Sequence, residues 1–271
     1  SLKKFYPTDT LVTGPDIIFF WVARMIITGF EFKDEAPFKD VYFTSILRDE
    51  TGKKLSKSLG NSPDPFDLFD EYGTDAVRFG TMLMAPQGLD VLFSKERLEV
   101  GRNFMNKLWN ACRFIQLNLG EEWDSEFQLD YENTDLELSE KWIISRLSNM
   151  IQEYNNQLDR FHFNEAAKDL YEFTWNDLCD WYLEIAKNRF YGQDKSKANI
   201  ARFVAIECIR TVLTLLHPYA PFITEELWSY FKPDGSTDLI IIPWIKNGSI
   251  RDKSAEDNMD ILKEVITSIR S

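Results

Sequence analysis

The chain has 271 residues, 44% of them apolar and 14% aromatic, which is enough to build one large or two medium packed domains. Three cysteines in no paired spacing and only two histidines argue against a disulfide framework and against a zinc site. The most apolar run, Ile17 to Ala23, is too short to cross a bilayer, so we expect a cytoplasmic protein without a membrane partner.

The net charge of −13 is unevenly distributed along the chain. Residues 121–140 hold nine acids and no base, which leaves only −4 for all the other residues. This acidic stretch is predicted to be a solvated connector. The rest of the surface therefore has room for local basic patches that could meet a nucleic acid.

Residues 1–62 are predicted to form the rear part of an α/β domain. Thr13–Asp16 resembles a capping box, and the run Ile17 to Ala23 is apolar on every face, which predicts a buried helix ending near Gly29. Val41–Ile46 is predicted to be a strand. About sixty residues offer one or two strands and one helix, fewer than a doubly wound sheet needs. We therefore expect the chain to begin inside a domain.

The loop Lys53–Asn61 follows this strand and a predicted turn at Asp49–Gly52. It carries three lysines and two serines within six residues, bordered by Gly52 and Gly60. Ammonium groups, hydroxyl donors and flexible glycines together suit the binding of a polyphosphate. A Walker loop is excluded, because no glycine stands at the required spacing before a Gly-Lys-Ser/Thr. The alternatives to a phosphate loop are a solvated basic surface and a nucleic-acid-binding patch.

Residues 63–97 are predicted to contain two short helices, Asp64–Tyr72 and Asp75–Met84, and the remainder of the chain is predicted to be a helical bundle. Ser139 and Asn164 are predicted N-caps, and Leu239–Ile242 a short strand. The bundle helices are expected at about residues 95–119, 139–160, 163–191, 196–217 and 222–231, with a final amphipathic helix at 255–269.

Several motifs, spread in the expected order along the chain, resemble the valyl-tRNA synthetase family of class I aminoacyl-tRNA synthetases. Lys54–Ser58 is similar to the K-M-S-K-S signature of that class, with leucine in place of methionine. Four further segments resemble valyl enzymes: Thr13–Met25, Gly101–Asn110, Cys179–Glu184 and His217–Phe222. The H-I-G-H signature and room for an editing domain are missing, so we expect a fragment that does not aminoacylate by itself.

The resemblance implies a domain plan and a reaction. Residues 1–62 would be the C-terminal part of a Rossmann-type catalytic domain, and 63–97 a stem-contact region. Residues 98–245 would be a helical anticodon-binding domain, and 246–271 a linker with the start of a C-terminal region. The complete enzyme, expected to be a monomer, would activate valine with ATP and Mg²⁺ and transfer it to tRNA(Val). No protein-bound metal is predicted.

The same resemblance assigns site residues in the first domain. Lys54 and Lys57 would be catalytic, and Ile17 and Trp21, one helical turn apart, would line the valine pocket. The ATP contacts would come from a larger set: Gly14, Asp16, Lys54, Ser56, Lys57 and Ser58. The alternatives are that Asp16 is a plain helix cap and that Ile17 and Trp21 are ordinary core.

The helix expected near 95–119 carries the predicted RNA surface. One stripe would hold Arg102, Asn106, Trp109 and Arg113, with Asn103, Lys107 and Asn110 beside it. The opposite side would be core: Gly101, Phe104, Met105, Leu108, Cys112, Ile115 and Leu119. Guanidinium, amide and aromatic groups together suit the phosphates and unstacked bases of an RNA loop. The alternative is a solvated helix face.

Two other functions compete with a valyl enzyme. One is an isoleucyl-type synthetase, against which Ile17 and Trp21 argue in their sequence context. The other is a non-catalytic helical module that binds RNA or protein, with the lysine loop as plain surface. Amino-acid-dependent pyrophosphate exchange by the complete protein would separate these possibilities.

Overall fold

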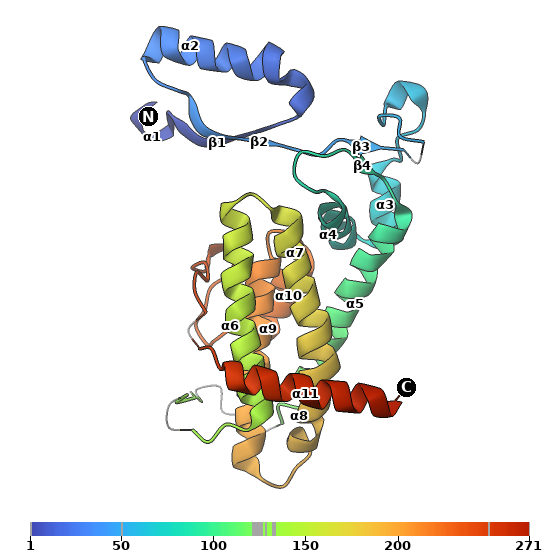
Figure 1. The fold of residues 1–271 in the computed structure, drawn as a ribbon, viewed down its shortest axis with the longest axis vertical. Helices are drawn as coiled ribbons and strands as arrows, with labels where there is room; N and C mark the ends of the chain where they lie inside the picture. The colour runs from blue at the N-terminus through green and yellow to red at the C-terminus, as the bar shows by residue number, and fades with distance from the viewer. Residues whose placement is uncertain are drawn as a thin grey trace.

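The computed structural model describes residues 2–49, 51–120, 127, 129–131, 134–248 and 250–270, and for Lys57 the backbone alone. These residues form a small α/β unit, a junction of short strands and helices, and a helical bundle (Figure 1). The long helix α5 (Lys95–Leu117) runs from the junction into the bundle (Figure 1).

The α/β unit is one β–α–β stretch of chain. Its strands pair in parallel, with Thr8 opposite Phe38 and Thr13 opposite Phe43, and parallel pairing requires the helical crossover between them. In chain order its elements are α1 (Leu2–Phe5), β1 (Thr8–Thr13), a 3₁₀ turn (Pro15–Ile17), a π-helical turn (Ile18–Val22), α2 (Ala23–Lys33) and β2 (Phe38–Phe43).

The junction joins a second parallel pair to two short helices. Its elements are β3 (Leu47–Arg48), a 3₁₀ turn (Lys57–Leu59), α3 (Pro65–Tyr72), α4 (Thr74–Met84) and β4 (Val91–Leu92), which pairs with β3. The Asp64 carboxylate accepts a hydrogen bond from the Phe66 amide and Pro65 opens the helix, so the start of α3 follows from its sequence. The two helices predicted here are confirmed.

Every helix predicted for the bundle is confirmed. The expected helix at 163–191 is a continuous helical run with a π-helical middle. The elements after α5 are α6 (Leu138–Asp159), α7 (Phe163–Glu172), the π-helical segment (Phe173–Tyr182), α8 (Leu183–Phe190), α9 (Lys195–Leu216), α10 (Pro221–Phe231), a 3₁₀ turn (Leu239–Ile241) and α11 (Lys253–Arg270).

The bundle core is rich in aromatic side chains, and the hydroxyls of its two fully buried tyrosines are paired. Tyr154 and Tyr182 are fully buried, and their hydroxyls donate to the carbonyls of Leu215 (2.6 Å) and Ala201 (3.1 Å). Such pairing offsets the cost of burying a phenol. The apolar side predicted for α5 is confirmed, since Phe104, Leu108 and the other residues predicted for it, apart from the half-buried Leu119, are buried.

Helices α4 and α5 approach each other backbone to backbone at two glycines. A Cβ on Gly101 would lie 2.3 Å from the Ala76 carbonyl oxygen, and one on Gly80 would lie 2.7 Å from the Arg97 carbonyl oxygen. These two glycines therefore set the spacing between the junction and the helix that leads into the bundle.

The prediction of a buried helix at Ile17 to Ala23 is wrong. Phe19 and Phe20 are 76% and 64% exposed. Strands of parallel sheets are normally covered on both faces. In the described part of the chain the α/β unit has two strands and α2, and this apolar run lies on its outside.

The ends of the predicted crossover helix are also wrong. Thr13 closes β1 instead of capping a helix, and its buried hydroxyl has no hydrogen-bond partner among the described residues. Helix α2 passes Gly29 and ends at Lys33, and its C-cap residue Asp34 adopts φ +58°. A Cβ on Gly29 would lie 2.8 Å from Cδ of Pro37, so this glycine serves close packing.

Two predicted caps and one predicted strand are corrected as well. Glu137 and His162 occupy the N-cap positions of α6 and α7, two residues before the predicted Ser139 and Asn164. Leu239–Ile241 forms a 3₁₀ turn where a strand was predicted. An apolar run of this length does not distinguish a strand from a 3₁₀ turn.

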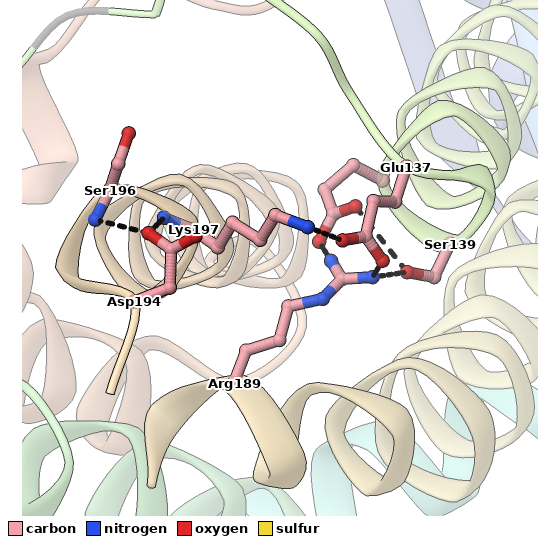
Figure 2. Close-up of polar contacts among 7 residues, drawn as sticks. Glu137, Ser139, Arg189, Asp194, Ser196 and Lys197 are labelled. Carbon is pink, nitrogen blue, oxygen red and sulfur yellow. Dashed lines mark hydrogen bonds and ion pairs between the residues drawn. The ribbon is translucent and has the colours of Figure 1, made fainter. Parts of the chain in front are cut away.

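A polar cluster joins three helices at one end of the bundle (Figure 2). From the end of α8, the Arg189 guanidinium donates to Ser139 (3.0 Å) and Glu137 (2.5 Å) and pairs with Glu140, all at the start of α6. From α9, Lys197 pairs with Glu137 at 3.0 Å. The Glu140 carboxylate is 1% exposed, so Arg189 supplies the charge that neutralises it.

The acidic connector is not purely solvated. Leu129 and Leu136, both within the predicted stretch, are buried in the bundle core. Residues 121–126, 128, 132 and 133 lie outside the described residues, and for them the expectation of a solvated connector stays a prediction.

Among the described residues, none of the helices combines the length and the apolar character that a bilayer crossing requires.

Candidate functional site

The lysine loop leaves β3 as a tight hairpin. Arg48 and Lys54 form an isolated antiparallel bridge, and the Asp49 amide donates to the Lys53 carbonyl at 2.8 Å. Gly52 closes the turn at φ +82°, a backbone conformation that favours glycine. The loop thereby begins at the carboxyl end of a parallel strand, where open α/β proteins bind their ligands.

One carboxylate organises the turn. Asp49 Oδ1 accepts hydrogen bonds from the Thr51 amide (3.0 Å), the Thr51 hydroxyl (2.7 Å) and the Lys53 amide (2.9 Å). Its Oδ2 accepts from the Asn61 side-chain amide at 2.7 Å. These bonds, led by the one from the Thr51 hydroxyl, lower the pKa of Asp49 to about 2, so the group is ionised at neutral pH.

The loop brings Lys54, which is predicted to be catalytic, next to Asp16, which follows β1 and is predicted to contact ATP. Lys54 Nζ lies 2.7 Å from Asp16 Oδ2, and both side chains are more than half exposed. The hydroxyls of Ser56 and Ser58 lie 2.7 Å apart. A cation, a carboxylate and two hydroxyls are therefore accessible on this side of the junction, the donor and acceptor types that a nucleotide requires.

The remaining residues predicted for this site differ in how they are placed. The Lys57 side chain lies outside the described part of the chain. Nothing lies within 4 Å of the place where a Cβ on Gly14 would stand, so its backbone is open to a ligand. Ile17 and Trp21 are 42% and 44% exposed, and the regular helix predicted to hold both is replaced by a 3₁₀ turn and a π-helical turn.

The predicted stripe on α5 faces a groove beside α10. Two hollows, of 410 and 280 Å³, share Trp109 as a wall. Arg102 and Asn106 line the larger hollow, and Arg113 lines the smaller one. The Arg102 guanidinium lies 5.5 Å from the centroid of the Tyr72 ring, a cation–π distance. The stripe is thus one accessible face, as predicted.

Two of the residues predicted to flank the stripe lie on another side of α5. Lys107 and Asn110 line a separate hollow of 210 Å³ between α5 and α8, together with Phe114 and Lys187. Lys107 pairs with Asp180 and lies 4.0 Å from the ring centroid of Trp175, so its charge is already compensated. Asn103, the third flanking residue, is exposed.

Sequence reasoning missed Asp49, Asn61, Phe114 and Lys187. An aspartate followed two residues later by threonine and then glycine is typical of a side-chain-capped turn, and this signal could have identified Asp49. Asn61 has no such local signal, because its partner lies twelve positions away in the chain. Phe114 and Lys187 come together only when α5 and α8 pack.

Two family models cover most of the chain. The model described as tRNA synthetases class I (I, L, M and V) matches residues 1–94, which hold the α/β unit and nearly all of the junction. The model described as the anticodon-binding domain of tRNA ligase matches residues 140–271, which hold the bundle helices from α6 onward.

Curated relatives are similar over the full chain. Valine–tRNA ligase of Fusobacterium nucleatum is 48% identical over 275 residues, which cover 100% of this chain and 31% of that protein. The Chlorobaculum tepidum and Bacillus cereus valine–tRNA ligases are 44% and 41% identical, again over 100% of this chain, and 31% and 30% of their own lengths. The chain therefore spans about a third of the length of the relatives it matches.

Solved structures share the fold at low identity. The LeuRS–tRNA–LeuAMS ternary complex of Agrobacterium radiobacter superposes with a TM-score of 0.70 at 22% identity, covering 93% of this chain and 30% of that one. Mycobacterium tuberculosis methionyl-tRNA synthetase with methionyl-adenylate gives 0.67 at 18% identity, covering 92% and 50%. An α/β catalytic part followed by a helical anticodon-binding bundle is thus a shared architecture.

Proposed function

The chain belongs to the class I tRNA synthetases of the isoleucine, leucine, methionine and valine group, and on this premise we propose that it forms the loop-bearing catalytic part and the anticodon-side bundle of a valine–tRNA ligase. The complete enzyme activates valine with ATP and Mg²⁺, the metal entering as part of the nucleotide substrate, and transfers the valyl group to tRNA(Val). It acts in the cytoplasm as a monomer.

The observation that carries the catalytic half is the placement of Lys54 against Asp16. These groups come from two different parallel strand pairs and meet 2.7 Å apart at an accessible surface. A nucleotide entering here exchanges the pair: its phosphates take the Lys54 ammonium, and its ribose hydroxyls take the Asp16 carboxylate. The open backbone at Gly14 gives the nucleotide room beside them.

The chemistry then needs cations where charge develops. A valine carboxylate oxygen attacks the α-phosphorus, and the bond to the departing pyrophosphate breaks. Lys54 and Lys57 stabilise the negative charge on the phosphates, while Ser56 and Ser58 donate hydrogen bonds. Loss of one such preplaced donor costs about 2.7–4 kcal/mol of transition-state stabilisation. Two further side chains line the valine pocket, Ile17 and Trp21.

The tRNA contacts come from exposed and half-buried residues of α5: Arg102, Asn103, Asn106, Lys107, Trp109, Asn110 and Arg113. The arginines offer bidentate phosphate contacts, and Trp109 offers a stacking face. The hollow beside α8 adds a second ring, Phe114, with the Lys187 ammonium 5.6 Å from its centroid. Lys107, whose charge is compensated by Asp180, acts by position more than by charge.

We place the domain limits after residues 62, 97 and 245, with one refinement at the end. Helix α11 packs on α6, where Ser145 donates to Glu256 at 2.6 Å, and Lys263 pairs with Asp177 at 3.2 Å. Residues 253–270 thus belong with the bundle in space.

Valine-dependent pyrophosphate exchange by the complete protein tests the catalytic half. Lys54→Ala lowers the exchange rate by a factor on the order of 10², because a developing charge loses its cation, and leaves the KM for valine unchanged. Lys39→Ala, which removes an exposed lysine paired with Asp9, is the matched control and leaves the rate unchanged. Exchange at the wild-type rate in Lys54→Ala would refute the role of Lys54. Exchange that depends on isoleucine and not on valine would show that the enzyme is an isoleucyl-type synthetase.

Binding of tRNA(Val) across a salt series tests the RNA half. Arg102→Ala and Arg113→Ala each flatten the plot of log affinity against log salt by about 0.7–0.9 for every phosphate that the variant no longer neutralises. Arg251→Ala removes an exposed arginine far along the chain from the stripe and serves as the control. Unchanged slopes in both stripe variants would exclude this groove from the interface.

A further inference from the structure

Asn61 contacts none of the side chains that are proposed to bind ATP. It binds instead the backbone of two residues that carry such side chains, Lys54 and Ser56. Its side-chain oxygen accepts from the Ser56 amide at 2.9 Å, and its side-chain nitrogen donates to Asp49 Oδ2 at 2.7 Å and lies 3.3 Å from the Lys54 carbonyl oxygen. One amide group thus binds the chain on both sides of Leu55. Asp49 in turn accepts hydrogen bonds from Asn61 and from Thr51 and Lys53 of the turn that opens the loop.

The bonding directions decide where the functional side chains go. With the Lys54 carbonyl and the Ser56 amide turned towards Asn61, the Lys54 side chain points outward, 60% exposed, to Asp16. The Ser56 hydroxyl lies beside that of Ser58. We term the bonds from the side chains of Asp49 and Asn61 the loop clasp. The loop clasp therefore fixes the outward side chains of Lys54, Ser56 and Ser58 without contacting these side chains.

Among the described residues, the backbone bonds between the loop and β3 end at Leu55, whose amide donates to the Leu47 carbonyl at 3.3 Å. Gly52 and Gly60, at φ +82° and +66°, lie near its two ends, and the residues between them belong to no strand or long helix. Positioning of reacting groups loses its effect when an unrestrained chain must be ordered during the reaction. The loop clasp removes this ordering step before the nucleotide arrives.

We propose that Asp49 and Asn61 are positioning residues for adenylation, which preorganise Lys54, Ser56 and Ser58 as one rigid phosphate-binding unit. The inference rests on the proposed function and deepens it. The loop clasp is independent of the partner that Lys54 has, because every bond of the clasp lies within residues 49–61. Asp49 and Asn61 contact no substrate atom in this role.

A reciprocal swap in the complete enzyme tests the loop clasp. D49N sets two amide groups against each other, and N61D sets two carboxylates against each other where 2.7 Å now separates donor from acceptor. The double variant D49N/N61D restores a donor and an acceptor between positions 49 and 61 with the net charge unchanged, and it gives up only the longer bond to the Lys54 carbonyl (3.3 Å). The measurement is kcat and the KM values for ATP and valine in pyrophosphate exchange.

Each single variant is expected to lower kcat about tenfold or more, with the KM for valine within twofold of wild type, because the amino-acid pocket is untouched. The swap is expected to return kcat to within threefold of wild type. For N61D alone, kcat is expected to recover partly as the pH is lowered, since a shared proton restores a hydrogen bond between the carboxylates. D70N, the same charge change on an exposed residue of α3, is the control.

Wild-type kcat in both single variants would overturn the proposal, and so would a double variant no better than the worse single one. Equal melting temperatures for the single variants and wild type are needed to read kcat as positioning and not as unfolding, and the swap rescue decides the matter if they differ. Absence of any amino-acid-dependent exchange in wild type would instead refute the proposed function, before the variants are compared.

Discussion

Arg189 illustrates how one side chain stabilises several helices. Its guanidinium meets three groups at the start of α6, among them the buried carboxylate of Glu140. Removal of one partner of a buried ion pair leaves the other charge without compensation in a medium that solvates it poorly. The free-energy cost of removing Arg189 is therefore set by the uncompensated charge of buried Glu140 and not by the strength of the ion pair itself.

Arg189→Ala should lower the free energy of unfolding by about 3–5 kcal/mol, as measured by urea denaturation of this chain. The matched control is Lys197→Ala, which removes a cation from the same cluster. Its pair with Glu137 is 58% and 45% exposed, so the loss should stay within about 1 kcal/mol. Equal losses in the two variants would show that burial does not distinguish the pairs.

At the scale of single residues, the sequence predicted what depends on helical period and little of what depends on tertiary contact. The faces of α5 followed from its apolar spacing, because the helix is long and regular. The link from Asp49 to Asn61 and the partners of Arg189 did not, since each joins residues far apart in the chain. Lys107 is predicted to bind RNA from its place beside the stripe on the helix, a position that does not reveal its pairing with Asp180.

At the scale of elements, the contact between α4 and α5 depends on the absence of a side chain. Gly101→Ala would bring a methyl group to 2.3 Å from a backbone oxygen of α4, and a helix backbone cannot yield locally. The helices must separate, which should cost about 1–3 kcal/mol or more in thermal or urea unfolding. Gly14→Ala makes the same change in open space and should be nearly neutral. A neutral Gly101→Ala would mean that the helices can separate freely.

Helices were predicted well and their ends poorly, for physical reasons. Long amphipathic runs such as α5 and α9 repeat the same signal over several turns, whereas a cap depends on one residue. The run Ile17 to Ala23 is predicted to be a buried helix because it is apolar on every face, but residues Ile18–Val22 form a π-helical turn whose large side chains, apart from Val22, lie on the outside of a two-stranded unit. Burial depends on neighbouring layers, which the run itself does not encode.

At the scale of the whole molecule, α4 holds the joint between α9 and α10. The Asp75 carboxylate accepts from the amides of Ile223 (2.6 Å) and Phe222 (3.4 Å) at the start of α10. The Arg78 guanidinium donates to the carbonyls of Pro218 and Tyr219 just after α9. Negative and positive side chains thus meet the helix ends of opposite polarity. Burial is the main cause that raises the pKa of Asp75, so its bonds offset a real desolvation cost.

Arg78→Ala in the complete enzyme should separate the two half-reactions. Under the proposed function, pyrophosphate exchange is a reaction of the catalytic part and does not need the bundle, so it should stay within twofold of wild type. Aminoacylation needs the bundle and the loop held in a fixed relation, so kcat/KM for tRNA should fall on the order of tenfold, within the range of long-range coupling energies. Arg160→Ala, an exposed arginine at the end of α6, is the control. A parallel loss in both assays would contradict this division.

The double role of α4 bears on how such enzymes can be recombined. A chimera cut between residues 97 and 98 would transplant α9 and α10 without Asp75 and Arg78, and would leave four backbone groups at their joint without partners. A cut before residue 63 carries the joint along with its helices. Grafting a foreign anticodon bundle should therefore succeed at the earlier seam, and exchanges made at the later one should need a donor whose own α4 equivalent is moved with it.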